Sequence, residues 1–441
     1  MPGNDVRVLI DGPEAYPRML DVIAQAARWI HFENYIIRSD AAGWRFAEAL
    51  MARAREGIHV RVLYDALGSS GTRRKYWRAL GDAGVEVRAF HPLQPLDLAA
   101  NFSRNHRKLV VADGNRAVMG GLCIGDEWTG EASEGERPWR DTAVEVAGPA
   151  CALLDQSFAG IWGVAGGQVP DEDTAGRVAP QGEAEVRVIA GVPGRERTYR
   201  VTELLTAGSM HRLWITDAYL VAPPRLLQAL QDAARDGVDV RLLLPGSSDL
   251  PLVRNVSRIG YRELLRSGVR IYEWEGPMLH AKTIVADGRW SRIGSSNLNA
   301  SSLMGNWELD VLIENGRLAE AMEHQFRLDI ARSREVTRRP VRAPGRISSA
   351  LPTVLSHQDP EVAVPEHHRS LRERRKRAAL ALRIVLANAR RSIFLPLTLL
   401  LIVLGVFFFV LPTTAAYTFG VLCAWLALSA WREAFRRRAD R

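Results

Sequence analysis

The hydrophobic pattern of the chain repeats itself. The segment EGIHVRVL at residues 56–63 returns as DGVDVRLL at 236–243, and LGDAGVEV at 80–87 returns as LLRSGVRI at 264–271. Each segment contains the end of a polar helical pattern, then a glycine, then a short apolar run. This order is typical of a buried strand that follows a helix. We therefore expect an α/β fold with two duplicated α/β/α sandwich domains, related by a pseudo-twofold axis, with mainly parallel or mixed sheets.

Two stretches rich in proline and glycine divide the chain. They predict linkers at residues 166–185 and 336–368. The domains expected on either side of the first linker are residues 1–165 and residues 186–335, and each contains one copy of the repeated pattern.

An uncharged apolar run at residues 392–431 follows the second linker. Its length suits two transmembrane helices of about 18 to 20 residues joined by a turn at Pro412. Basic residues flank the run, so the preceding segment 369–391 and the tail 432–441 are both expected on the cytoplasmic side. Residues 369–391 are predicted to form a basic juxtamembrane helix along anionic headgroups, and a solvated charged helix is the alternative.

The net charge of +8 is unevenly distributed along the chain. Residues 331–441 hold 20 basic and 7 acidic side chains, whereas residues 1–330 hold 38 basic and 43 acidic ones. The body of the protein is therefore mildly acidic, which argues against a nuclease, and no nucleic-acid partner is expected. The three cysteines are far apart and no signal peptide is indicated, so we expect a reducing compartment.

Lysine is rare in this chain, yet two of its four lysines stand two residues after a histidine. The pattern occurs once in each half with identical internal spacing, and its two copies comprise His106, Lys108, Asp113, His280, Lys282 and Asp287. Because positions i and i+2 of a strand share a face, each histidine and its lysine are expected to project together. The aspartates fall in the Asp-Gly turns that follow, where we expect them to brace the turn.

Two copies of one pattern in a duplicated fold indicate a single shared pocket. If the halves pack about a twofold axis, two imidazoles and two ammonium groups converge there. Such a set suits a phosphate-like anion: the lysines neutralise phosphoryl oxygens, one neutral histidine attacks phosphorus, and the other, protonated, donates to the leaving alcohol. This scheme requires no metal and no other cofactor.

These motifs resemble the phospholipase D superfamily. The pattern HxKxxxxD occurs twice, and a turn that reads GSSNLN follows the second copy. More narrowly, five segments are similar to bacterial cardiolipin synthases, namely FENYI, GGLCIGDEW, WRDTAVEVAGP, VDVRLLLPGSSD and GPMLHAK. The resemblance extends from residue 5 to residue 330. It implies a phosphohistidine intermediate that an alcohol or water attacks later.

The resemblance also implies roles for single residues. His106 would be the nucleophile and His280 the general acid, although the duplication leaves the opposite assignment open. Asp141 and Glu308 are expected to orient the imidazoles by accepting from the ring nitrogen that is not used in chemistry. An ordinary salt bridge at a strand edge is the alternative for both carboxylates. Asn297 is expected to support phosphate binding.

Two positions depart from the pattern of the family. When the two copies are aligned on their motifs, Cys123 falls opposite Asn297, where the family has asparagine. A thiol is a weak donor, so one phosphate contact is expected to be missing. Residues 299–302 read NASS where cardiolipin synthases have an Asp-x-Arg-Ser run, which removes an arginine. A nucleophilic Cys123 is the alternative reading, but the two histidines already supply that role.

Together these features predict a phosphatidyltransferase similar to cardiolipin synthase. It would attack phosphatidylglycerol, release glycerol and transfer the phosphatidyl group to a lipid hydroxyl. The alternatives are a hydrolase that yields phosphatidic acid, a nuclease or other phosphodiesterase, and an inactive membrane scaffold. The expected location is the bacterial inner membrane as a multi-pass protein with cytoplasmic catalytic domains. The sequence leaves the oligomeric state open.

Overall fold

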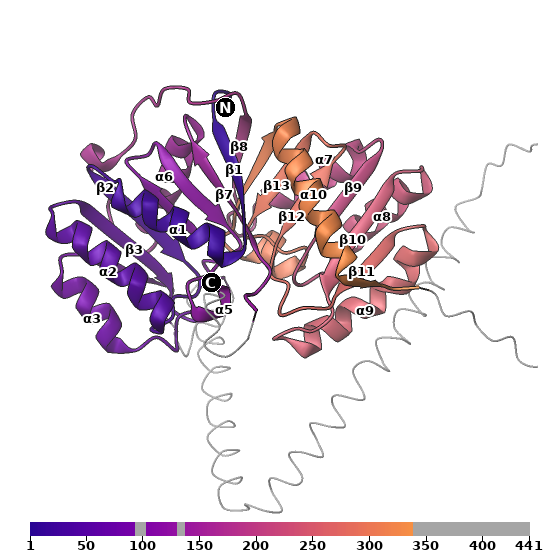
Figure 1. The fold of residues 1–441 in the computed structure, drawn as a ribbon, viewed down its shortest axis with the longest axis horizontal. Coiled ribbons are helices and arrows are strands. Elements are labelled where there is room, and N and C mark those ends of the chain that lie inside the picture. Colours follow the sequence, from indigo (N-terminus) through magenta and orange to yellow (C-terminus); the bar gives the residue numbers. More distant parts are fainter. Residues whose placement is uncertain (93–102, 130–136, 338–441) are drawn as a thin grey trace, which may run out of the picture. The chain divides into compact units, whose positions relative to one another are not determined.

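Two β-sheets, one from each half of the chain, organise the computed structural model (Figure 1). The structure describes residues 1–92, 103–129 and 137–337. Within these residues the first sheet has seven strands in the order β1-β7-β6-β5-β2-β3-β4. The second has eight in the order β15-β11-β10-β9-β12-β13-β14-β8.

The elements have the following bounds. The strands of the first sheet are β1 (Asp5–Ile10), β2 (Trp29–Asn34), β3 (His59–Asp65), β4 (Glu86–Phe90), β5 (Leu109–Ala112), β6 (Arg116–Gly120) and β7 (Thr142–Ala147). Those of the second are β8 (Glu185–Ala190), β9 (Arg212–Thr216), β10 (Asp239–Pro245), β11 (Arg270–Trp274), β12 (Thr283–Ala286), β13 (Trp290–Gly294), β14 (Leu309–Glu314) and β15 (Ser333–Glu335). The helices are α1 (Asp11–Ala24), α2 (Ala41–Arg55), α3 (Arg74–Asp82), α5 (Asp126–Thr129), α6 (Ala150–Val164), α7 (Arg197–Gly208), α8 (Pro224–Arg235), α9 (Pro251–Arg266) and α10 (Gly316–Ala331), with a 3-10 turn η1 (Asp171–Asp173) and a π-helical turn η2 (Ser301–Gly305).

Both sheets are mixed and share one plan. Strands β2, β3 and β4 are parallel neighbours, as are β9, β10 and β11, and the remaining pairs are antiparallel. Helices connect the parallel strands because parallel neighbours need a crossover between them. The expected α/β fold with two related sheets is confirmed. Of the two forms that were expected, mainly parallel or mixed, both sheets take the mixed form.

Each sheet buries both of its faces. Side chains of α1, α2 and α3 pack on one face of the first sheet, and those of α7, α8 and α9 pack on one face of the second. The opposite faces pack on α6 and α10, and strands from both halves contribute to one core there. Phe326 of α10 also joins a smaller cluster with side chains of β9, β10 and β11. Figure 1 shows α6 and α10 beside the strands of this central region. The two halves are therefore joined by a common hydrophobic core, and a site between them has fixed walls.

Helix α6 shows how the sequence produces this core. Leu154, Phe158, Ile161 and Trp162 are spaced by four, three and one residues, so they lie on one face of the helix. All four are fully buried against strands of the shared core. Burial of each such side chain contributes about 1.5–3 kcal/mol. Helix α6 thus anchors the first half to the second.

The membrane predictions concern residues outside the described part of the chain. The segments predicted as a basic helix (369–391), a transmembrane hairpin (392–431) and a tail (432–441) all lie there, as does most of the linker 336–368. Within the described residues no helix is both long and apolar enough to cross a membrane. The domain limits 1–165 and 186–335 stay predictions.

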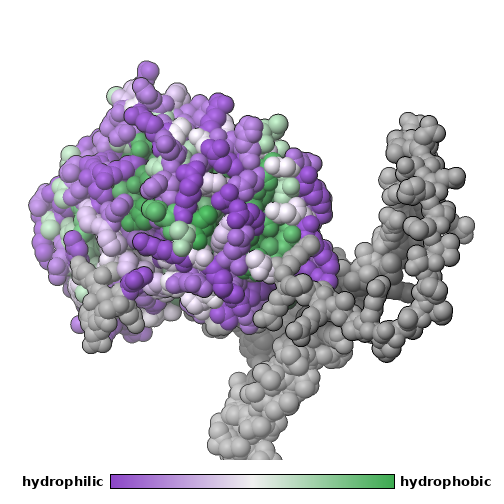
Figure 2. Space-filling model, turned by 45° about the vertical axis from the view of Figure 1, so that its right-hand side comes forward, coloured by the Kyte–Doolittle hydropathy of each residue, from purple (hydrophilic) through white to green (hydrophobic). Residues whose placement is uncertain are grey.

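In the view of Figure 2 a hydrophobic area lies amid a mostly hydrophilic surface.

Candidate active site between the two halves

The two His-x-Lys motifs meet where the halves join. Each histidine lies just before a strand, β5 in the first half and β12 in the second. The backbone N–H of His106 donates to the carbonyl of Trp307, 2.9 Å away, and the N–H of His280 donates to the carbonyl of Arg140, 2.8 Å away. Each motif is thus held by a segment of the opposite half. Those two segments carry the carboxylates expected to orient the imidazoles.

Each imidazole is paired with a carboxylate from the other half. His106 Nδ1 lies 3.0 Å from Glu308 Oε2, and His280 Nδ1 lies 2.7 Å from Asp141 Oδ2. All four side chains are at least largely buried. With Nδ1 engaged by a carboxylate, the tautomer is fixed so that Nε2 keeps a free lone pair. Each pair therefore presents one ring nitrogen for chemistry.

The carboxylates are themselves held by further donors. Asp141 accepts from Trp128 Nε1 at 3.1 Å and from the backbone of Thr142 at 2.8 Å. Glu308 accepts from the hydroxyls of Ser295 and Ser302. Burial alone would raise the pKa of both carboxyls, but the adjacent imidazoles and lysine cations hold the pKa of each below its usual range. Both carboxylates are therefore charged at neutral pH.

Both lysines of the motifs are buried at the centre of this arrangement. Each Nζ donates to the backbone carbonyl of its own motif histidine. Burial lowers the pKa of Lys108, and it lowers that of Lys282 to about 8, where the charge of Lys108 adds to the effect. The two ammonium groups are thus close enough to repel each other. An anion between them would relieve this repulsion.

The histidines are neutral in the free site. Burial, followed by the charge of Lys282, lowers the pKa of His280 to about 4, against the opposing pull of Asp141. Burial also lowers the pKa of His106, although Glu308 opposes it. A neutral imidazole with a free Nε2 can act as a nucleophile, whereas a proton donor needs a bound anion that favours the imidazolium.

Asp113 and Asp287 lie in turns away from the imidazoles. Their backbones have positive φ angles of 51° and 52°. The carboxylate of Asp113 accepts from three consecutive backbone amides, those of residues 27, 28 and 29, and Asp287 does the same with residues 210, 211 and 212. Each aspartate thus fixes the start of a neighbouring strand, β2 or β9. These contacts favour the bracing role over a catalytic one.

The two halves differ at the position of Asn297. Asn297 is buried, and its Oδ1 has no hydrogen-bond partner among the described residues. Cys123 occupies the equivalent place in the first half and is also buried. Burial raises the pKa of the Cys123 thiol, while Lys108 and Lys282 oppose this rise. The thiol therefore lies close to both lysines without being a thiolate.

Several residues of the site were missed in the sequence. The Tyr35 ring lies edge-on to His106, 4.9 Å between centroids, and Lys108 Nζ lies 5.2 Å from its centre. Tyr219 stands in the same relation to His280 and Lys282, at 6.2 Å and 6.0 Å. Each tyrosine closely follows a buried strand, β2 or β9, but this position alone does not link it to a motif in the sequence. Two indoles, Trp128 and Trp139, flank His280 as well.

Arg107, between the histidine and lysine of the first motif, joins the two halves. It is buried and donates to the carbonyls of Glu308, Ser157 and Gly191, each at 3.1 Å. The equivalent position in the second motif is Ala281. This cation therefore has no counterpart in the repeat. It fixes the Glu308 segment, whereas the Asp141 segment is not held by an equivalent arginine.

Structural neighbours show the fold of the protein. The chain is similar to a phosphatidylserine synthase from Haemophilus influenzae Rd KW20, with a TM-score of 0.60, 16% identity and coverage of 75% of this chain and 87% of that one. It is also similar to a polyphosphate kinase from Porphyromonas gingivalis, with a TM-score of 0.51, 12% identity and coverage of 74% and 47%. Both likenesses concern the fold alone.

Sequence relatives are more similar. The chain is 34% identical over 340 residues to cardiolipin synthase 2 of Bacillus anthracis, which covers 76% of this chain and 66% of that protein. It is 34% identical over 341 residues to cardiolipin synthase A of Pseudomonas entomophila (strain L48), covering 76% and 70%. The chain thus spans about two thirds of the length of these relatives. The profile of the family described as cardiolipin synthase, PLD-like domain matches residues 19–162 and 202–330. This protein therefore belongs to the cardiolipin synthase family with its phospholipase D-like domain.

Proposed function

We propose that this protein is a phosphatidyltransferase that uses phosphatidylglycerol as its substrate. The observation that carries the proposal is the pair of imidazole–carboxylate contacts, made across the two halves and accompanied by two buried lysines. Two nucleophilic nitrogens and two cations in one site would match a phosphodiester anion. The curated relatives bear the name cardiolipin synthase, which supports a phospholipid substrate.

The first half-reaction forms a phosphohistidine. Nε2 of one imidazole attacks phosphorus, the bond from phosphorus to the glycerol oxygen breaks, and the second imidazole gives its proton to that oxygen. Lys108 and Lys282 balance the negative charge on the phosphoryl oxygens. Asp141 and Glu308 stabilise the imidazole that becomes positively charged. Glycerol leaves and the phosphatidyl group stays on the histidine.

The second half-reaction transfers that group to a lipid hydroxyl. The second imidazole, now neutral, takes the proton of the acceptor hydroxyl while its oxygen attacks phosphorus and the P–N bond breaks. When the acceptor is another phosphatidylglycerol, the product is cardiolipin. Following the resemblance to the family, we assign nucleophilic attack to His106 and proton transfer to His280.

The proposed location is the cytoplasmic face of the bacterial inner membrane. The uncharged run 392–431 and the basic segment 369–391 support this placement, because they would hold the site near anionic headgroups. A lipid acceptor is then present at high local concentration. This concentration would favour transfer over hydrolysis.

Product analysis tests the reaction. Membranes that contain full-length protein receive labelled phosphatidylglycerol, and the lipid products are separated for wild type, His106→Ala and His280→Ala. Cardiolipin with released glycerol, lost in both variants, is the expected result. His324→Ala is the matched control, because this histidine is exposed on α10 and should leave turnover unchanged. Phosphatidic acid as the sole product would establish a hydrolase, and turnover that survives both substitutions would overturn the proposal.

A further inference from the structure

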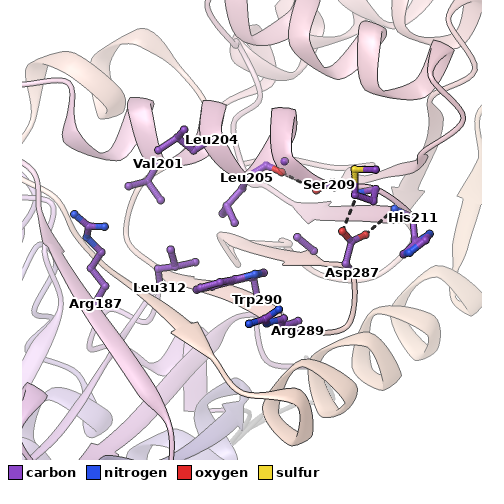
Figure 3. A pocket seen from close by; sticks show the side chains of 13 residues that line it. Arg187, Val201, Leu204, Leu205, Ser209, His211, Asp287, Arg289, Trp290 and Leu312 are labelled. Carbon is purple, nitrogen blue, oxygen red and sulfur yellow. Dashed lines mark hydrogen bonds between the residues drawn. The ribbon is translucent and has the colours of Figure 1, made fainter. Parts of the chain in front are cut away.

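A pocket of about 510 Å³ lies in the second half, between α7 and the turn that joins β12 to β13 (Figure 3). Apolar side chains form most of its wall, and they are Val201, Leu204, Leu205, Met210, Ala286, Trp290 and Leu312. Asp287, which lines the pocket, directly follows β12, whereas Lys282 of the His-x-Lys motif directly precedes that strand. The pocket is therefore separate from the site between the halves.

In the first half, charged side chains fill the place that is equivalent to this pocket. There Glu145 of β7 pairs with Arg18 of α1 at 2.8 Å and with Arg116 of β6 at 2.7 Å. These three charged side chains link α1 to the sheet. Arg116 also donates to Gln25 at the end of α1. Ion pairs and hydrogen bonds therefore occupy the space beside α1 in this half.

The strand registers identify the counterparts of these residues. Arg116 pairs with the last residue of β7 as Trp290 pairs with the last residue of β14, and Glu145 corresponds in the same way to Leu312. Trp29 and Arg212 are equivalent, because the carbonyl of each accepts from the backbone N–H of a motif aspartate. Val201 lies as many residues before Arg212 as Arg18 of α1 lies before Trp29, so Val201 corresponds to Arg18. An ion-pair network in one half is thus replaced by three apolar side chains in the other.

This replacement leaves an open apolar space. Helix α1 packs on β5 and β6, whereas the main contacts of α7 are with α8, β8 and η2. At the rim Leu204 is 71% exposed and Met210 is 74% exposed. Apolar surface that remains in contact with water is unfavourable, and a built apolar pocket of this size is typical of a ligand site. The open space therefore suits an apolar ligand.

The edge of the pocket is cationic. Arg187 is exposed and forms no ion pair with a described residue. Arg289 lies over the Trp290 ring, 5.6 Å from its centre, and also pairs with Glu314. The one carboxylate of the wall, Asp287, is already satisfied by three backbone amides. Figure 3 shows Arg187 beyond Leu312 and Arg289 beside Trp290.

We propose that this pocket binds an acyl chain of an anionic phospholipid, with the phosphate at Arg187 and Arg289. The apolar wall excludes a polar headgroup from the interior, and the arginines at the edge favour a negative charge over a zwitterion. The lipid would hold the second half at a membrane surface without taking part in the reaction. The inference does not depend on which reaction the histidines catalyse.

Photolabelling tests the pocket. Full-length protein is mixed with vesicles of phosphatidylglycerol that carry a diazirine on one acyl chain, irradiated and digested, and labelled peptides are identified by mass spectrometry. Label is expected on peptides of α7 and β13. The double variant Val201→Arg with Leu312→Glu places an Arg–Glu pair where the first half has Arg18 and Glu145, and it should reduce this label about tenfold or more. His106→Ala should leave the label unchanged.

A second variant covers the case in which the double variant does not fold. Arg187→Gln changes only an exposed residue and should weaken the label severalfold, while Leu328→Gln, an exposed leucine outside the pocket, should not. Diazirine-labelled phosphatidylcholine should label the same peptides less. Equal labelling by both lipids, label that survives both pocket variants, or capture of residues 392–431 by a photoreactive group at position 204 would each overturn the proposal.

Discussion

His280 in the second half and Asp141 in the first half are joined by a contact of 2.7 Å between Nδ1 and Oδ2. The reciprocal contact joins His106 to Glu308 at 3.0 Å. Neither half therefore contains a histidine together with the carboxylate that orients it. Relative movement of the halves would break both pairs at once, and the hydrophobic core that the halves share opposes such movement.

Removing the charge of either carboxylate should cost activity more than stability. Asp141→Asn and Glu308→Gln each keep the shape of the side chain but lose the negative charge that favours the imidazolium. We expect kcat to fall roughly a hundredfold or more in each variant, the range in which general acid–base catalysis contributes. Initial rates of product formation with labelled phosphatidylglycerol measure the effect.

Asp155→Asn provides a matched control for this experiment. Asp155 lies 2.7 Å from His31, and both side chains are buried in the first half without contacting either imidazole of the His-x-Lys motifs in the hydrogen bonds of the described residues. This variant should lose stability, because a buried hydrogen-bonded pair is weakened, and keep its kcat. An equal fall in kcat for Asp155→Asn and Asp141→Asn would show that the loss comes from general disruption.

The motif aspartates should behave in the opposite way. Asp113→Asn and Asp287→Asn each weaken three hydrogen bonds from backbone amides to a carboxylate. We expect each to reduce the free energy of unfolding by about 1.5–3 kcal/mol, the usual contribution of a hydrogen bond to a charged group. Denaturant unfolding measures this loss. A kcat per folded molecule that fell as far as in Asp141→Asn would contradict the bracing role.

The repeat made part of this architecture predictable. His106 and His280 were identified because strand periodicity and a constant offset between the two copies act on the same motif. The α/β class followed from helix, glycine and strand patterns that recur in both halves. Such signals are local, so they survive in a single sequence. The prediction that both motifs contribute to one site followed from the duplication.

Other parts depend on contacts that no local pattern encodes. The sequence identified a carboxylate in each half. It did not show that each carboxylate pairs with the histidine of the other half, because this pairing depends on how the halves pack. Tyr35 and Tyr219 do not share the constant offset that relates the two motifs, so aligning the copies on their histidines does not pair them. Arg107 has an alanine as its counterpart and gave no repeated signal. Long-range packing decides these features, and it became visible only in three dimensions.

Cys123 should prove dispensable for catalysis. Burial raises the pKa of its thiol, and a thiol is a poor nucleophile compared with a thiolate. We expect Cys123→Ala to keep activity within about fivefold of wild type, whereas His106→Ala should lose at least about a hundredfold. Trapping the covalent intermediate and digesting it should locate phosphorus on a histidine. A loss in Cys123→Ala as deep as that in His106→Ala would reinstate the thiol as a nucleophile.

The buried imidazoles should make stability depend on pH in a defined window. The pKa of His280 is about 4 in the folded protein, below the usual 6.5, chiefly because of burial. As pH falls from 6.5 to 4 the unfolded chain gains a proton at this position that the folded chain does not bind, so the free energy of unfolding falls by up to about 1.36 kcal/mol per pH unit. Asp141 and Glu308, with lowered pKa values, lose their stabilising effect only at lower pH.

Urea unfolding of detergent-solubilised full-length protein between pH 7 and pH 4.5 measures this effect. The free energy of unfolding should therefore depend less steeply on pH in His280→Gln than in wild type. The exposed His324→Gln should keep the wild-type slope, and an unchanged slope in His280→Gln would refute the argument.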